Sequence, residues 1–400
     1  MSDLSLRAVP PRSHPARVSV GTESRWPSPR LRVGLLGTYP PTECGIATFT
    51  RNVRAALLEA RPSWQVPIVR VVEQPAPFAL AEVAASWVRG RPQTMSHVLS
   101  VLNECDVVVI QHEFGIFDGD DGEAVLDLVR ELHVPLVVEL HTVLVAPSAQ
   151  QRSIVQSLLD RAELVVVPSA SALARLRATH HVRRGALVPH GATANFERRP
   201  HERRPGGLVL TWGLLGPGKG IEDAIRAVAE LRDLYPPVTY VVAGHTHPHE
   251  RANGDHYRRR LEALAAELGV GTMVRLDDQY RDRAALNGLI RSADVVLLPY
   301  ETTEQVSSGV LVEALASARP VVATRFPHAV ELLAGGAGLI VEHADPLSMS
   351  LALRRVLREP GLAARMAVHS RAIGESLTWP TVAEQLSRLL ESLVMRVPFR

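Results

Sequence analysis

From residue 31 onward, short apolar runs alternate with amphipathic stretches, and this alternation limits the fold more than any other feature. The runs are rich in Val, Leu and Ile and do not alternate with polar residues, which is typical of parallel strands buried on both faces. Amphipathic stretches such as residues 49–60 and 124–132 separate them and predict helices. The pattern therefore predicts doubly wound α/β structure. The expected strands are residues 31–36, 66–71, 106–110, 135–140, 163–167, 186–188, 208–212, 239–243, 272–276, 294–298, 320–323 and 338–341.

The pattern runs twice, which predicts two α/β domains of similar size. A polar segment rich in Arg and Pro, around residues 195–207, separates the two series of runs. We expect a disordered tail over residues 1–30, a first domain over 31–195, a second over 206–375, and a final amphipathic helix and tail over 376–400. Two such domains facing each other form a cleft lined by the carboxyl ends of both sheets, where α/β folds bind ligands.

Composition excludes several classes of protein. A net charge of +2 gives no electrostatic reason to bind nucleic acid. Cys44 and Cys105 are the two cysteines, too few for a disulfide framework, which favours a cytoplasmic location. No apolar run is long enough to cross a membrane. Six arginines in the first 32 residues leave room for weak peripheral contact with an anionic membrane surface.

Lys219 is the single lysine of the chain, beside 43 arginines. It lies in a glycine-rich turn (Gly213 to Gly220) between an apolar run and a helical pattern, together with Gly216 and Gly218. Lysine is a compact point charge, whereas arginine is a wide planar fork. Its retention in a turn that suits anions predicts contact with one phosphate group.

A second anion site is predicted where Ser307, Ser308 and Gly309 precede a helix. The free N–H groups of Ser308, Gly309 and Val310 should face outward with the positive end of the helix dipole. Glu313 lies four residues after Gly309 on the same helix face. A carboxylate beside a phosphate would be repelled, so Glu313 is expected to reach neutral hydroxyls such as those of a ribose.

Together these motifs resemble the GT-B glycosyltransferases of the retaining family 4 type (glycosyl transferases group 1), over nearly all of residues 31–394. The resemblance implies two Rossmann-like domains and a final helix, beginning near Trp379 and Pro380, that crosses back onto the first domain. It implies that Lys219 neutralises the diphosphate of a nucleotide sugar, that the amides of Ser308 to Val310 bind it, and that Glu313 holds the ribose.

Two positions depart from the family pattern. Leu214 stands where the family has an arginine, and it cannot contact phosphate through charge. Gln305 stands where the family has the first of two glutamates, with Glu304 one residue out of register. Glutamine still hydrogen-bonds sugar hydroxyls but brings no charge. Gln305 with Ser307 and Ser308 resembles a subgroup with mannose-type donors.

The first domain supplies the other side of the cleft. Residues 37–49 resemble the family's acceptor-side loop, with Thr38 and Tyr39 near the acceptor and Gly45 close to the distal phosphate of the donor. His141 follows an expected strand and matches the family histidine beside the reacting sugar. His112 follows another strand and is expected to line the acceptor site. In the second domain Asp277, Asp278 and Tyr280 lie, by position, where such enzymes contact the base.

The predicted activity is transfer of a hexosyl group from a UDP- or GDP-linked sugar to an acceptor hydroxyl, with retention and without a metal or other cofactor. Catalysis would involve His141, Lys219, Gln305 and Glu313. The acceptor could be a saccharide, a lipid-linked sugar or a small metabolite. Two alternatives stay open: a non-catalytic sugar-nucleotide-binding protein, and another GT-B enzyme such as a sugar-nucleotide epimerase or phosphorylase.

Three other motifs are given structural interpretations. The Lys219 turn matches a P-loop except that Gly220 replaces the Mg²⁺-binding Ser or Thr, which argues against an NTPase. The histidines at 245, 247 and 249 are expected to form a polar loop near the nucleotide rather than a metal site. Asp118, Asp120 and Asp121 are expected to begin the helix over residues 124–132.

Overall fold

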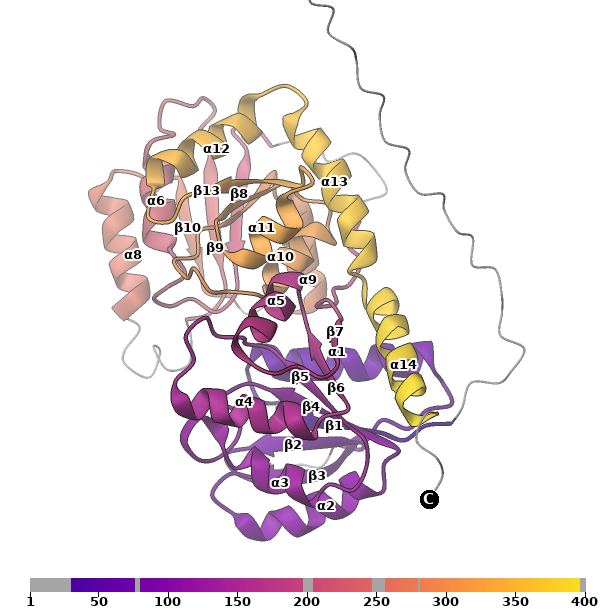
Figure 1. Ribbon diagram of the computed structural model, residues 1–400. Coiled ribbons are helices and arrows are strands. Elements are labelled where there is room, and N and C mark those ends of the chain that lie inside the picture. Colours follow the sequence, from indigo (N-terminus) through magenta and orange to yellow (C-terminus); the bar gives the residue numbers. More distant parts are fainter. Residues whose placement is uncertain (1–29, 76–79, 197–203, 247–255, 280, 396–400) are drawn as a thin grey trace, which may run out of the picture.

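The computed structural model describes residues 30–75, 80–196, 204–246, 256–279 and 281–395. Apart from Arg30, the predicted tail over residues 1–30 therefore lies outside the described part. Two parallel sheets, each flanked by helices on both faces, face each other, as the sequence predicted (Figure 1).

The first sheet has the strand order β3-β2-β1-β4-β5-β6-β7, with every pair parallel. The sequence did not predict β3, because two alanines and a serine make it less apolar than its neighbours. Its strands are β1 (Val33–Gly37), β2 (Ile68–Val72), β3 (Val83–Val88), β4 (Val107–His112), β5 (Leu136–Leu140), β6 (Leu164–Val167) and β7 (Gly185–Leu187). The accompanying helices are α1 (Gly45–Ala60), α2 (Met95–Asn103), α3 (Val125–Glu131), α4 (Ala149–Arg161) and α5 (Ala170–Thr179), with short 3-10 turns η1 (Pro92–Thr94) and η2 (Asp120–Gly122).

The second sheet has the order β10-β9-β8-β11-β12-β13 and is also parallel. Its strands are β8 (Leu208–Trp212), β9 (Thr239–Ala243), β10 (Val274–Asp277), β11 (Val295–Leu298), β12 (Val321–Thr324) and β13 (Gly338–Val341). Its helices are α6 (Ile221–Ala229), α8 (His256–Glu267), α9 (Arg283–Ser292), α10 (Gly309–Leu315), α11 (Pro327–Leu333), α12 (Pro346–Arg358) and α13 (Leu362–Ser376).

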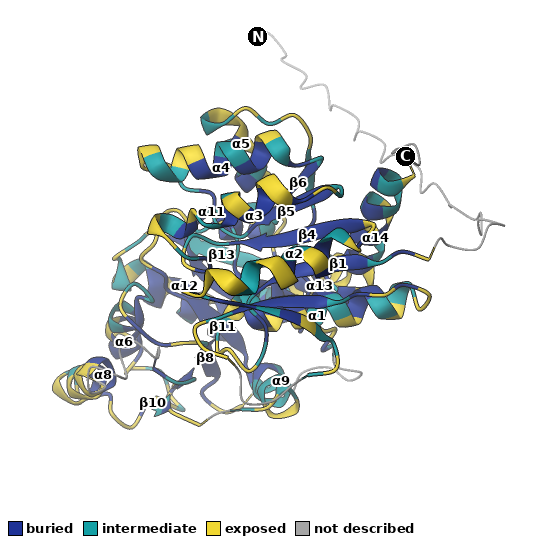
Figure 2. Ribbon diagram, turned by 90° about the horizontal axis from the view of Figure 1, so that it is seen from below, coloured by how far each residue is buried: buried dark blue, intermediate teal, exposed yellow. Residues whose placement is uncertain are grey.

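Both faces of each sheet are buried. In the first sheet Leu36 and Ile110 face the core beneath α2 to α4, whereas Leu35 and Val109 face the core beneath α1. The central strands are dark blue in Figure 2, and the outer faces of the helices are yellow. Continuous Val, Leu and Ile runs are the sequence signature of this burial on both faces.

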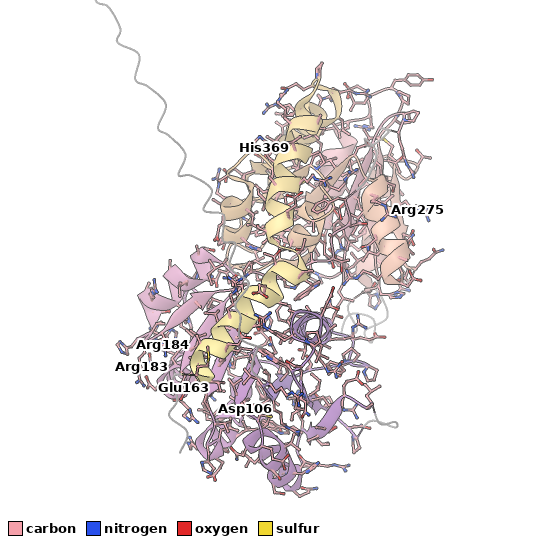
Figure 3. All side chains as sticks on the ribbon, turned by 90° about the vertical axis from the view of Figure 1, so that its right-hand side faces the viewer. Asp106, Glu163, Arg183, Arg184, Arg275 and His369 are labelled. Carbon is pink, nitrogen blue, oxygen red and sulfur yellow. The ribbon has the colours of Figure 1, made fainter. Side chains whose placement is uncertain are left out.

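The last helix, α14 (Trp379–Val394), crosses back to the first domain, as predicted (Figure 3). Trp379, Leu386 and Leu390 join the core beneath α1. Arg61 at the end of α1 donates to Glu384 (2.6 Å) and Glu391 (2.7 Å) of α14. Among the described residues, no helix is long and apolar enough to cross a membrane.

A second contact joins the domains on the far side of the cleft. Glu331 of α11 accepts from the backbone N–H groups of Ala170 (2.9 Å) and Ser171 (3.0 Å), which begin α5. Arg175 of α5 donates to the carbonyl oxygens of Val143 (2.7 Å) and Glu304 (2.8 Å). The position of the Glu304 loop therefore depends on both domains.

Candidate active site in the interdomain cleft

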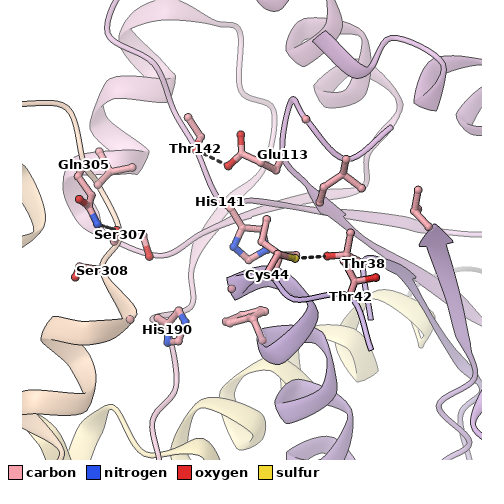
Figure 4. Close-up of a pocket in the computed structure, with 18 of the residues that line it drawn as sticks. Thr38, Thr42, Cys44, Glu113, His141, Thr142, His190, Gln305, Ser307 and Ser308 are labelled. Atoms are coloured by element: carbon pink, nitrogen blue, oxygen red, sulfur yellow. Dashed lines mark hydrogen bonds between the residues drawn. The ribbon is translucent and has the colours of Figure 1, made fainter. Parts of the chain in front are cut away.

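Two adjoining cavities lie between the domains. The larger, about 1700 Å³, is lined by loops that follow β1, β2, β4 and β5 on one side and β8 and β11 on the other. The smaller, about 1060 Å³, lies between the start of α1 and the loops after β8, β9 and β10. Both are lined by Pro41, Thr42, Cys44 and Gly45, so the start of α1 lies where they meet. Figure 4 shows the larger cavity.

Lys219 lines the larger cavity. Burial lowers the pKa of its ammonium group, which lies 4.9 Å from the centre of the Tyr300 ring. No carboxylate of the described residues pairs with it, although a buried cation without a counter-ion is costly. The turn that positions it requires glycine at Gly220, where φ is +66° and a Cβ would lie 1.8 Å from the Pro299 oxygen. Gly216 and Gly218 shape this turn but do not line either cavity.

The start of α10 differs from the sequence expectation at one amide. Ser308 begins the helix, and its Oγ accepts from the N–H of Leu311 (3.2 Å). Its own N–H donates to Nδ1 of His328 (2.9 Å), so the prediction that this amide is free was wrong. The N–H groups of Gly309 and Val310 have no acceptor among the described residues, and both residues line the cavity, as do Ser307 and Ser308.

Gln305 also lines the larger cavity. Its side-chain amide donates to the Ser307 carbonyl (2.8 Å), which leaves its oxygen available to a ligand. This bond, drawn in Figure 4, holds the Gln305 side chain against the loop that precedes α10.

Glu313 lines neither cavity. One carboxylate oxygen accepts from Nε1 of Trp212 (3.2 Å), and the other pairs with Arg283 (2.5 Å). Glu313 was expected to reach the hydroxyls of a ribose, but in this structure its carboxylate is bound to Arg283 of α9 and lies outside both cavities. Each oxygen keeps a second acceptor site that a ligand hydroxyl could share.

His141 lines the larger cavity and is the last member of a buried chain of hydrogen bonds. Its Nε2 lies 2.7 Å from Oε1 of Gln111, whose amide donates to Glu139 (2.9 Å). Burial lowers the pKa of His141 to about 3 and raises that of Glu139 to about 7. The imidazole is therefore neutral at neutral pH, and its hydrogen bond to Gln111 fixes the orientation of the ring.

His190 is a cavity residue that the sequence analysis missed. Its ring packs 4.9 Å from Phe49, and a Cβ on Gly309 would lie 3.1 Å from its Nε2. Burial lowers its pKa. In the sequence, the position of His190 shortly after an expected strand, now β7, was the cue for a cleft residue. The next residue is Gly191, where a Cβ would lie 2.3 Å from Trp379. Figure 4 shows His190 below His141 and Ser308, near the start of α10.

Two predicted acceptor-side residues do not reach the cleft. His112 is 1% exposed and packs against Phe114 and Phe117, because β4 continues two residues beyond its predicted end. Tyr39 is 2% exposed and donates to Glu82 (3.1 Å). Thr38 does line the larger cavity, with its hydroxyl 3.1 Å from Sγ of Cys44.

The predicted base contacts are also displaced. Asp277 is 5% exposed and pairs with Arg281 (2.7 Å) and Arg275 (2.9 Å). Asp278 pairs with His245 (2.8 Å) and Arg258 (3.2 Å). Neither aspartate lines the smaller cavity, which Gln279 and Arg281 reach instead. Tyr280 lies outside the described residues.

Among the residues that the structure describes, no three His, Cys, Asp or Glu side chains are grouped so as to hold a metal ion. His247 and His249 lie outside that part of the chain. Asp118 accepts from Gly90 N (3.0 Å) and from Arg89 Nε (3.3 Å). The helix after it, α3, begins at Val125, so Asp118 does not cap it.

Sequence comparison identifies relatives of this chain. Residues 194–372 match the family model of the glycosyl transferases group 1. A D-inositol 3-phosphate glycosyltransferase of Corynebacterium jeikeium is 33% identical over 180 residues, which are 44% of this chain and 41% of that protein. One of Corynebacterium urealyticum is 29% identical over 60% of this chain and 58% of that protein. The chain thus spans about half the length of these curated relatives.

Solved structures extend the likeness to the whole fold. The sucrose-phosphate synthase of Thermosynechococcus elongatus has a TM-score of 0.72 at 20% identity and covers 92% of this chain and 100% of its own. Anabaena Alr3699/HepE in complex with UDP and glucose has a TM-score of 0.71 at 18% identity and covers 91% of this chain and 100% of its own. Residues 194–372 are therefore similar to the glycosyl transferases group 1, and the whole chain has the GT-B fold.

Proposed function

We propose that this protein transfers a hexosyl group, with mannosyl as the first candidate, from a UDP- or GDP-linked sugar to an acceptor hydroxyl. The anomeric configuration would be retained, and no metal ion would be required. The similarity of the second domain to glycosyl transferases group 1 supports a nucleotide sugar as the donor, as do the Anabaena structures in complex with UDP, with UDP and glucose, and with UDP-glucose. The curated relatives are named for D-inositol 3-phosphate, which makes cyclitols one class of acceptor to test.

One observation carries the proposal: the single lysine is buried in the wall of the cleft, and no described carboxylate pairs with it. The free N–H groups of Gly309 and Val310 line the same cavity. A diphosphate leaving group needs charge stabilisation of this kind in the transition state, and preorganised donors provide it most effectively in a site sheltered from water.

In the proposed reaction the acceptor oxygen bonds to the anomeric carbon as the bond from that carbon to the phosphate oxygen breaks. The acceptor proton passes to the departing phosphate oxygen, so no protein nucleophile is needed. Lys219 and the two amides stabilise the negative charge that develops on the diphosphate. His141, which is neutral and held by Gln111, hydrogen-bonds the reacting sugar, and Gln305 contacts its hydroxyls.

Leu214 supports the non-catalytic alternative. It is 38% exposed and lines the smaller cavity where the family pattern has a cation. Nucleotide binding without sugar transfer would favour that alternative.

A transfer assay tests the proposal. UDP- and GDP-linked glucose and mannose are incubated with the protein and a set of sugar acceptors, with and without EDTA. Released nucleoside diphosphate is quantified, and NMR gives the anomeric configuration of the product. We expect retained configuration, no effect of EDTA, and a loss of about 10² to 10³ in kcat/KM for Lys219→Ala.

The matched control is Arg226→Ala, an exposed cation on the helix after the Lys219 turn. It should leave the activity unchanged. Transfer with inversion or a strict metal requirement would contradict the proposed mechanism, and no transfer from any donor would contradict the activity itself.

A further inference from the structure

The charges in the larger cavity restrict what the acceptor can be. The described lining holds two cations and four carboxylates, so its charge is unfavourable to anions beyond the diphosphate. The cations are Lys219 and Arg89, and the carboxylates are Glu73, Glu113, Glu301 and Glu304. Lys219 lies in the second domain, in the same cavity as the start of α10, and is assigned to the donor, which leaves Arg89 for the acceptor half.

Arg89 is already neutralised. It follows β3 and pairs with Glu73 through Nη1 and with Asp118 through Nε (3.3 Å). Asp118 is itself fixed, because it also accepts from Gly90 N (3.0 Å) and Trp87 Nε1 (3.4 Å). A guanidinium held between two carboxylates offers little attraction to a third anion.

Glu113 places a carboxylate in the same cavity as His141, bonded to the residue that follows it. One oxygen accepts from the Thr142 hydroxyl (2.6 Å) and the other from the N–H of Phe114 (3.0 Å), which holds the group rigid. Figure 4 shows Glu113 and Thr142 beside His141 on the wall of the cavity. An ionised carboxylate accepts about four hydrogen bonds, so Glu113 can still bind hydroxyl or ammonium groups of a ligand.

The histidines of the cavity do not add positive charge. Burial lowers the pKa of both His141 and His190, so both rings are neutral near pH 7. A phosphate on the acceptor would therefore face Glu113 and Glu73 without an unpaired cation among the described lining residues.

We propose, as an extension of the proposed function, that the acceptor is an unphosphorylated polyol or amino-polyol whose hydroxyl or ammonium groups bind Glu113. The arrangement of Glu73, Arg89 and Asp118 selects against phosphorylated acceptors. This assigns Glu113 as an acceptor-binding residue and Glu73 as a specificity residue.

Matched acceptors test the assignment. The full-length protein, with the donor that it binds, is assayed with myo-inositol against D-inositol 3-phosphate, and with glucose and glucosamine against glucose 6-phosphate. We expect kcat/KM for each unphosphorylated compound to exceed that of its phosphorylated partner at least tenfold. Glu113→Gln should lower kcat/KM about tenfold more for glucosamine than for glucose, because the amide has no negative charge to form an ion pair with the ammonium group.

Glu73→Gln provides the converse test. The Glu73 side chain is 74% exposed, so its replacement should leave the fold intact while removing one of the two carboxylates that neutralise Arg89. The ratio of glucose 6-phosphate to glucose use should rise several-fold. Glu104→Gln, an exposed carboxylate paired with Arg32 outside the cleft, should leave that ratio unchanged.

The outcomes separate this inference from the proposed function. A phosphorylated acceptor used as well as its partner, or nucleotide binding without transfer to any of the five compounds, would overturn the inference. Absence of nucleotide binding, measured independently by calorimetry with UDP and GDP, would instead overturn the proposed function.

Discussion

Several ionisable side chains near the cleft are kept uncharged by burial. His112, His141 and His328 all have pKa values lowered by desolvation, to about 4, about 3 and about 4. His141 and His328 are hydrogen-bonded within the packed wall, to Gln111 and to the N–H of Ser308. Neutral rings keep the cleft free of cations other than Lys219 and the arginines, which suits a site where one placed charge meets the diphosphate.

These histidines predict a loss of stability in acid. Between about pH 6.5 and pH 4 the unfolded histidines bind protons that the buried rings cannot, so the free energy of unfolding should fall as the pH falls. Each histidine lowers the free energy of unfolding by up to about 1.4 kcal/mol for every pH unit of acidification in this range. Glu139 acts in the opposite sense, because its pKa is raised from 4.5 to about 7 and the folded carboxyl holds a proton that the unfolded one releases. These four groups together therefore contribute a net slope of about two protons.

Urea unfolding at pH 5.0 and 7.5 measures this effect. His112→Gln should reduce the difference in unfolding free energy between the two pH values, because His112 contributes without lining the cavity. The exposed His133→Gln is the control and should leave the difference unchanged. An unaltered difference in His112→Gln would contradict the assignment of the neutral buried ring.

At the scale of elements, the two series of apolar runs predicted most strands of both sheets and the final helix, because burial on both faces leaves a strong pattern. β3 was missed since its Ala and Ser residues dilute that pattern. The site was predicted less completely. The sequence placed His141, Lys219 and Gln305 in the cleft, but it could not show that β4 extends to His112 or that Arg281 holds Asp277. Such pairings depend on side chains brought together by the fold.

The contact between α1 and α14 should contribute measurably to stability. The Arg61 side chain is 12% exposed and bonds both Glu384 and Glu391, and these bonds raise its pKa. Arg61→Ala should lower the free energy of unfolding by about 2 kcal/mol, as expected for hydrogen bonds to charged groups. Arg388 also pairs with Glu384 but is 71% exposed, so Arg388→Ala should cost less than about 0.5 kcal/mol. Equal effects in the two variants, measured by chemical denaturation, would contradict this account.

At the scale of the whole molecule, the domains contact each other through α14 packed on α1, and through α11 and the Glu304 loop bound to α5. α14 holds the first domain through α1, and Glu331 of α11 binds the start of α5. The walls of the cavity thus come from two bodies whose relative position determines the distance between Lys219 and His141. Domain closure on a ligand commonly completes sites of this kind, and a nucleotide that bridges both walls should stabilise the joined form.

Nucleotide binding tests the central claim most directly. Thermal unfolding of the wild type, Lys219→Ala and Arg226→Ala is followed with UDP, GDP, ADP and TDP, with and without EDTA. A ligand at 100 times its Kd stabilises the folded state by about 2.7 kcal/mol. We predict a raised midpoint with UDP or GDP, unchanged by EDTA, retained in Arg226→Ala and lost in Lys219→Ala. No shift with any nucleotide, or an equal shift in Lys219→Ala, would contradict the assignment of the cleft as a nucleotide-sugar site.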